Sequence, residues 1–114
     1  MTSPITTHVL DTATGQPASG VAVTLDRETS PGEWTREGQG TTDTDGRLRT
    51  LLAPGALRAG VYRVSFDVGA YFAARSVEAF WRTVVVEFVV GDVGRHYHVP
   101  LLVSPFGYST YRGS

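Results

Sequence analysis

The 114-residue chain contains no cysteine and no lysine. Without cysteine, disulfides, thiolate zinc sites and cysteine nucleophiles are excluded. All ten cationic side chains are arginines, and with eleven acidic residues they give a formal net charge of −1. No basic stripe or acidic tail stands out along the chain. We therefore expect binding neither to nucleic acid nor to an anionic membrane.

Long apolar runs and targeting segments are missing as well. The longest apolar run, around Val84 to Val90, is far shorter than a membrane span. Met1 to Pro4 lacks the charged and apolar regions of a secretory signal, which favours a cytoplasmic protein. The length of the chain and its ordinary hydrophobic content fit a single globular domain, residues 1–114.

Short segments of alternating apolar and polar residues predict an all-β fold. The strands expected from them are Ile5–Asp11, Val21–Asp26, Trp34–Thr42, Val61–Val68, Thr83–Val90, His96–Val103 and Tyr108–Arg112. Pro54-Gly55 interrupts the segment Leu48–Ala59, which we interpret mostly as a connection. One short helix is expected at Ala70–Ala79. Seven or eight short strands with one brief helix predict an antiparallel β-sandwich.

The C-terminal segment, residues 96–114, carries the most chemistry. Alternation from His96 to Val103 gives this strand one apolar face and one face that bears His96 and His98. Pro100 within the strand indicates an edge strand, a bulge, or a position whose backbone nitrogen points away from the neighbouring strand. The aromatic strand that follows could be an exposed edge, which proteins usually cover by pairing with another subunit.

Four blocks of this sequence resemble the 5-hydroxyisourate hydrolases, the enzymatic branch of the transthyretin-like family. The matching residues are Thr6–Asp11 with Gly15 and Pro17, Thr44–Arg47, Tyr71–Ala74, and, in the tail, His96–Leu102, Ser104-Pro105 and Tyr108–Ser114. The resemblance covers essentially the whole chain, and its blocks occur in the order typical of the family. Arg82 stands where the family usually has proline, which puts the loop before the next strand in question.

The resemblance implies a transthyretin-like sandwich that hydrolyses the N1–C6 bond of 5-hydroxyisourate to give 2-oxo-4-hydroxy-4-carboxy-5-ureidoimidazoline. It also implies a homotetramer, in which edge strands pair into dimers and dimers pack back to back. From the residues alone we would expect only an oligomer. No cofactor is implied, because the hydrolases that this chain resembles work without metal.

His8, His96 and His98 are the only histidines. His-x-His on a strand puts both rings on one face, which is how some zinc sites begin, and His8 could add a third ligand. The further ligands that zinc requires are not apparent in the sequence, so we expect no metal. A lone histidine on a sheet surface usually has no special role. The resemblance raises His8 and His98 to candidate catalytic residues and leaves His96 without a role.

Two arginines follow the Asp45-Gly46 turn, and the ordinary interpretation of either is a solvated charge. Only Arg47 belongs to the Asp-Gly-Arg motif, so we favour Arg47 over Arg49. The candidate catalytic residues are His8, Arg47, His98 and Ser114. The candidate substrate-binding residues are Arg47, Tyr111, Arg112, Gly113 and Ser114, the last through its hydroxyl and the carboxylate of the chain.

The chemistry of a lactam ring opening suits these side chains. Imidazole can deprotonate water or protonate a leaving nitrogen near neutral pH, and guanidinium can stabilise an oxyanion. We expect His98 to activate water, Arg47 to hold the substrate and His8 to position or protonate, although either histidine could be base or acid. The alternative is a non-catalytic small-molecule carrier of the transthyretin type, because the fold alone cannot separate the two. A carrier would need apolar walls where these side chains lie.

Overall fold

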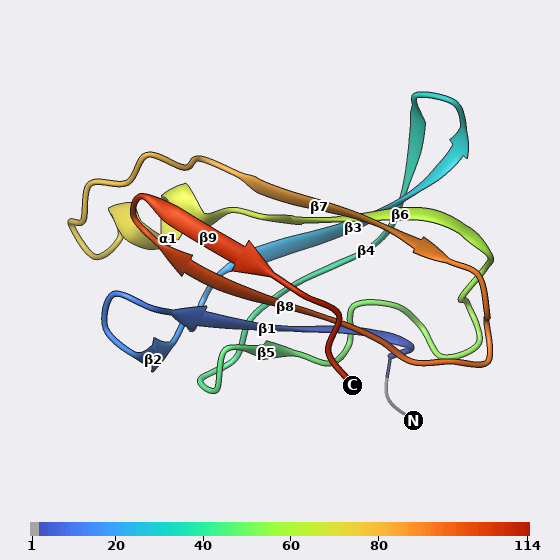
Figure 1. Cartoon of the computed structure of the whole chain (residues 1–114), viewed down its shortest axis with the longest axis horizontal. Coiled ribbons are helices and arrows are strands. Elements are labelled where there is room, and N and C mark those ends of the chain that lie inside the picture. The colour runs from blue at the N-terminus through green and yellow to red at the C-terminus, as the bar shows by residue number, and fades with distance from the viewer. Residues whose placement is uncertain (1–2) are drawn as a thin grey trace.

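The computed structural model of the protein describes residues 3–114. Its strands are Ile5–Asp11 (β1), Gln16–Pro17 (β2), Ala22–Ser30 (β3), Glu33–Thr41 (β4), Arg47–Leu48 (β5), Gly60–Phe66 (β6), Val84–Val90 (β7), Tyr97–Ser104 (β8) and Gly107–Thr110 (β9). One helix, α1, runs from Val68 to Ala73. The strands form two sheets, β2-β1-β8-β9 with β5 beside β1, and β4-β3-β6-β7. Figure 1 shows the two layers, with α1 at one end of them.

The predicted all-β sandwich is confirmed. Each of the seven predicted strands is present, and β2 and β5 are two-residue strands between them that the sequence does not predict. The sheets are antiparallel except for one pair, because β1 and β8 run parallel, with Thr6 opposite His98. The whole second sheet lies between these two strands in the sequence, so no hairpin forces them to be antiparallel. This parallel pair brings the first block of the resemblance beside the last.

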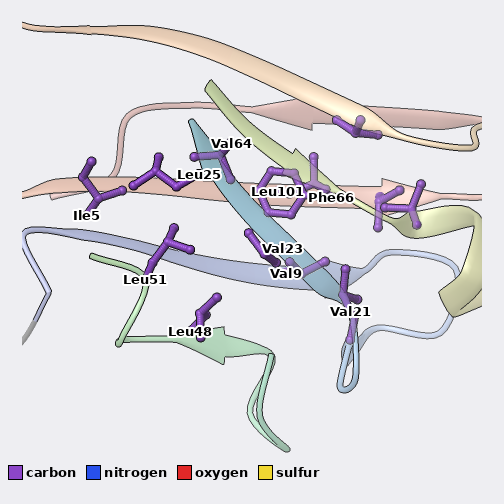
Figure 2. Close-up of a cluster of buried hydrophobic side chains, with 14 of the residues drawn as sticks. Ile5, Val9, Val21, Val23, Leu25, Leu48, Leu51, Val64, Phe66 and Leu101 are labelled. Carbon is purple, nitrogen blue, oxygen red and sulfur yellow. The ribbon is translucent and has the colours of Figure 1, made fainter. Parts of the chain in front are cut away.

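The core lies between the two sheets, where the alternating residues of their inner faces meet (Figure 2). Ile5 and Val9 of β1 and Leu101 of β8 face the second sheet and are fully buried. In the second sheet, Val23, Leu25, Tyr62, Val64, Phe66 and Val84 are buried as their alternation predicts, whereas Val86 and Phe88, expected on the same inward face of β7, are only partly buried. Leu48, Leu51 and Leu52 also enter the core, although the sequence suggested only a connection there.

Pro100 explains why the last strand is shorter than expected. The predicted strand Tyr108–Arg112 ends at Thr110 as β9. The register that pairs Leu101 with Thr110 brings Pro100 opposite Tyr111, and a proline has no N–H to donate to the ladder there. The regular ladder therefore ends at Thr110, and a single bridge between His98 and Gly113 continues the same register. The residues after β9 thus stay beside the histidine strand.

The helix is shorter than the expected Ala70–Ala79. Asp67 caps its N-terminus by accepting a hydrogen bond from the Ala70 N–H at 3.1 Å. At the other end, the Val77 N–H bonds back to the Phe72 carbonyl, and Ser76 takes a positive φ of 58°. This left-handed turn ends the helix. No helix among residues 3–114 has the length and apolar character needed to cross a bilayer.

Arg82 holds its loop through the backbone. Its carbonyl accepts a hydrogen bond from the Gly69 N–H at 2.9 Å, which fastens the loop to α1. A proline keeps its carbonyl, so either residue can make this contact at position 82. Glycine suits position 69, because a Cβ there would lie 3.1 Å from the Arg82 carbonyl oxygen and 3.2 Å from its Cα, a tight contact that the loop would have to relieve. The departure from the family pattern therefore leaves this loop anchored.

Candidate active site

The strand register places three of the predicted site residues, His8, Arg47 and His98, on the outer face of the first sheet. Arg47 of β5 lies opposite His8 of β1, and Thr6 of β1 lies opposite His98 of β8. Gly113 continues the second row on the far side of His98. Since Ile5, Thr7 and Val9 of β1 point inward, the alternation turns Thr6 and His8 outward. Two adjacent rows on one face thus carry the two histidines and the arginine.

A hollow of about 250 Å³ lies over this face. Its lining residues are Thr6, Thr7, Arg47, Arg49, His96, His98 and Ser114. The structure therefore brings Arg47, His98 and Ser114 together around one space. His8 is not among the lining residues, and it lies next to them through its pairing with Arg47.

The turn before β5 positions Arg47. One carboxylate oxygen of Asp43 accepts hydrogen bonds from the N–H groups of Asp45 and Arg47, at 2.8 and 3.0 Å. These bonds lower the pKa of Asp43 below its usual value, and the bond from the Arg47 N–H has the larger effect. Gly46 closes the turn at a φ of 75°, and a Cβ at this position would collide with the Val9 carbonyl oxygen. The Asp-Gly-Arg motif is thus a turn that directs Arg47.

The two arginines of this segment differ in their partners. Arg49 forms an ion pair with Asp43 at 3.8 Å. Within residues 3–114, no acidic side chain forms an ion pair with Arg47. Its guanidinium is therefore free to meet an external carbonyl or oxyanion, which supports the preference for Arg47 over Arg49.

His98 is joined to a second histidine through a hydroxyl. Its Nδ1 lies 2.8 Å from the Thr6 Oγ1, and the Nε2 of His96 lies 2.8 Å from the same oxygen. Sequence reasoning assigned no role to Thr6 or His96. The available signal for Thr6 was its place two residues before His8, on the same face of the strand, inside the first block of the resemblance.

The surroundings of His98 favour its neutral form. Burial lowers the pKa of His98 below its ordinary value of 6.5, and the nearby charges of His96, His8 and Arg47 lower it further. An interaction with the Thr6 backbone opposes this lowering only in part. A neutral imidazole has a free lone pair at neutral pH, so His98 can accept a proton from water.

Gly113 fits against the His98 ring. Its N–H donates to the His98 carbonyl at 2.9 Å. A Cβ on Gly113 would lie 2.5 Å from the His98 Cδ2 and 3.2 Å from its Cγ, far inside van der Waals contact. Gly113, expected to contact substrate, is thus the surface on which the imidazole rests.

We expect Gly113→Ala to lower kcat for the reaction proposed below by about 10- to 100-fold, because a methyl group would push the His98 ring from its place. Gly91→Ala is the matched control, since no atom lies within 4 Å of a Cβ there. Steady-state rates of both variants, with their melting temperatures, measure the effect. Equal rates for the two variants would contradict the positioning role.

Tyr111 and Arg112 lie around a different space. The Arg112 guanidinium carbon lies 4.6 Å from the centre of the Tyr97 ring. Arg112 and Tyr111 line a second hollow that shares only His96 and Ser114 with the first. The structure does not bring these two side chains into the hollow lined by Arg47, although both line a further, largely apolar hollow together with His98.

The arrangement supports acid–base chemistry by protein groups. Within the part of the chain that the structure describes, no three His, Cys, Asp or Glu side chains gather closely enough to hold a metal ion. The hollow instead combines a neutral imidazole with a permanently charged guanidinium. These two groups can activate water and stabilise the negative charge that forms on an attacked carbonyl oxygen.

Comparisons with known proteins give the family. The model of the HIUase/Transthyretin family matches residues 5–113. The 5-hydroxyisourate hydrolase of Salmonella typhimurium is 46% identical over 110 residues, covering 96% of this chain and 80% of the relative. That of Halalkalibacterium halodurans is 46% identical over the full length of both chains.

Two solved structures show both branches of the family. Klebsiella pneumoniae 5-hydroxyisourate hydrolase superposes with a TM-score of 0.84 at 38% identity, covering 96% of this chain and 97% of the other. Sea bream transthyretin in complex with thyroxine superposes with a TM-score of 0.91 at 36% identity, covering 96% and 94%. Both scores indicate one fold, so the backbone alone does not separate hydrolase from carrier. The chain belongs to the HIUase/Transthyretin family.

Proposed function

We propose that the chain hydrolyses the N1–C6 lactam bond of 5-hydroxyisourate, giving 2-oxo-4-hydroxy-4-carboxy-5-ureidoimidazoline in urate degradation. The observation that carries this proposal is the meeting of neutral His98 and unpaired Arg47 around one hollow. The identity of 43–47% to relatives named 5-hydroxyisourate hydrolase, over nearly the whole chain, supports the substrate.

In the proposed mechanism, His98 takes a proton from water as the water oxygen attacks C6. Arg47 holds the flat ring and stabilises the oxyanion on the attacked carbonyl. The leaving N1 then receives a proton and the ring opens. His8, beside Arg47, positions or protonates the substrate, and Ser114 contacts it from the tail. Tyr111, Arg112 and Gly113 remain proposed substrate contacts.

The test is to add the purified protein to freshly oxidised urate and to follow the ultraviolet decay of hydroxyisourate. We expect a decay much faster than the spontaneous one. A decay at the spontaneous rate would favour the alternative function, a non-catalytic small-molecule carrier, which the fold also supports. Binding of an aromatic ligand without turnover would then identify the carrier. The arginine and histidine side chains that line the hollow favour catalysis over mere binding of a ligand.

We expect kcat/KM to fall on the acid side with an apparent pKa below 6.5. The lowered pKa of His98 means that its ring stays a neutral base down to a lower pH than a free imidazole would. Folding stability should also decrease as the pH falls from 6.5 to the lowered pKa, because unfolded His98 binds a proton that the folded ring does not. Values of kcat/KM measured across a range of pH at constant ionic strength check the predicted acid limb. An acid limb above 6.5 would contradict it.

We also propose a homotetramer. Large apolar side chains are exposed on the edge strand β7 and along β9 and the tail, namely Val85, Val89, Tyr108 and Tyr111. Pairing of such edges between copies would cover them. Light scattering should give four times the mass of one chain, and a monomer in solution would refute the assembly.

The cytoplasmic location also remains a prediction, which cell fractionation would test.

A further inference from the structure

The Thr6 hydroxyl stands between two imidazoles, and it has one hydrogen to share. The Nδ1 of His98 and the Nε2 of His96 both lie 2.8 Å from Thr6 Oγ1. A hydroxyl donates one hydrogen bond and accepts others, so it can donate to only one of the two nitrogens. The other nitrogen must carry a hydrogen and donate to Oγ1. The protonation of the two rings is therefore coupled.

Two arrangements satisfy this chain when both rings are neutral. In the first, His98 donates through Nδ1–H to Thr6, and Thr6 donates to the bare Nε2 of His96. The Nε2 of His98 is then bare and can act as a base. In the second, every hydrogen of the chain points the other way, and the Nε2 of His98 carries a hydrogen that it can give away.

The two histidines at the ends of this hydrogen-bonded chain differ in their exposure to water. His98 is half-buried at the hollow and Thr6 is only 8% exposed, whereas His96 lies exposed at the surface. A positive charge on His98 is disfavoured by burial and by the nearby charges of His96, His8 and Arg47. A positive charge on the exposed His96 is solvated by water. The hydrogen-bonded chain thus connects His98, where a positive charge is unfavourable, with His96, where water solvates it.

We propose that Thr6 links His98 to His96 as a proton relay, in which His96 holds the positive charge between attack of water and departure of the leaving nitrogen. The relay rests on the proposed hydrolysis. Thr6 and His96 act through His98, and they are positioning residues rather than catalytic ones. The pairing of β1 with β8 creates the chain by placing Thr6 opposite His98.

The protons balance without any co-reactant. When water attacks, Nε2 of His98 gains a proton from it, Nδ1 passes its own proton to Thr6, and Thr6 passes its hydroxyl proton to Nε2 of His96. His98 is then neutral with Nε2–H, and His96 is cationic. When N1 leaves, Nε2 of His98 gives its proton to N1, and the chain returns one proton from His96 through Thr6 to Nδ1. The new carboxylic acid loses its proton to water.

The first experiment needs no substrate. Nitrogen NMR of the protein labelled at its three histidines, above the ordinary pKa of 6.5, reports which ring nitrogen carries the hydrogen. We expect His98 to be protonated at Nδ1 and His96 to have a bare Nε2. In Thr6→Val both rings should become mixtures of tautomers, and Thr6→Ser should restore the order. The same His98 tautomer in wild type and Thr6→Val would overturn the proposal.

The second experiment separates the relay from a structural role. We expect Thr6→Val to lower kcat by about 10- to 100-fold with KM changed by less than about twofold, a smaller loss than the ~10²–10⁴-fold assigned to a general base. Thr6→Ser should stay within about threefold of wild type. Thr24→Val, on the outward face of β3 in the other sheet, is the matched control and should leave kcat unchanged.

His96→Gln tests the charge-holding step itself, because glutamine can accept the Thr6 hydrogen but cannot hold a proton. Its kcat should fall as in Thr6→Val while His98 keeps its tautomer. The double variant should be no slower than the slower single variant, since both changes interrupt one chain. Additive losses, or wild-type kcat in His96→Gln, would overturn the relay. If wild type itself lacks activity, the proposed function fails, while the NMR result still decides whether the coupled chain exists.

Discussion

Replacement of His98 by alanine should lower kcat/KM for hydroxyisourate by about 10²–10⁴-fold, the range for loss of a general base. The ring is half-buried on the outer face of its sheet and is no part of the core between the sheets. Thr6 keeps His96 as a partner after the change, so no buried hydroxyl is left alone. The melting temperature should therefore change by only a few degrees. Ultraviolet decay assays and thermal melts measure the two effects.

The pH profile adds an internal check on this variant. The acid limb below 6.5 should disappear from the residual activity of His98→Ala, because the group that titrates there is gone. His8→Ala is the matched comparison, since His8 lies on the same face but outside the hollow lining. It should keep the limb. Full activity of His98→Ala, or the loss of the limb only in His8→Ala, would transfer the role of base to another group.

Replacement of Arg47 by alanine should lower kcat by about 10²–10³-fold, the cost of removing one donor to a developing oxyanion. The guanidinium has no ion-pair partner among the described residues, and its backbone is held by the Asp43 turn. The change thus removes a charge that the substrate would use, and it breaks no ion pair of the fold. Single-turnover rates would separate this effect from substrate binding.

Arg49→Ala is the control that the chain itself supplies. Arg49 lies two residues further on, lines the same hollow and forms an ion pair with Asp43. An exposed pair of this kind contributes little to stability, so we expect kcat within about threefold of wild type. Arg47→Lys should recover only part of the activity, because an ammonium lacks the planar fork of a guanidinium. Equal damage from both alanine variants would point to general electrostatic attraction instead.

The strands were predictable because burial and alternation go together. In β6, every second residue from Tyr62 to Phe66 is fully buried, as the period of two requires. The two-residue strands β2 and β5 were not predictable, since two residues carry no periodicity. The sequence predicts too long a helix because alanine favours helix locally, while the left-handed turn at Ser76 depends on the packing around it.

The site was only partly predictable. The residue types of Arg47 and His98 indicated the chemistry, and the family resemblance selected them from other arginines and histidines. Nothing in the local sequence connects Thr6 with His96, because they lie 90 positions apart and meet only through the pairing of β1 with β8. The role of Gly113 likewise depends on the bridge that forms after Pro100 interrupts the ladder.

The sequence by itself determined that this chain forms strands with one apolar face each, and which imidazoles and guanidinium groups are available. A period of two is a local property, readable from neighbouring residues. The tertiary structure alone decided which of these groups meet. A register is fixed by contacts between strands far apart in the chain, and here it places one hydroxyl between two imidazoles and leaves one arginine free beside them.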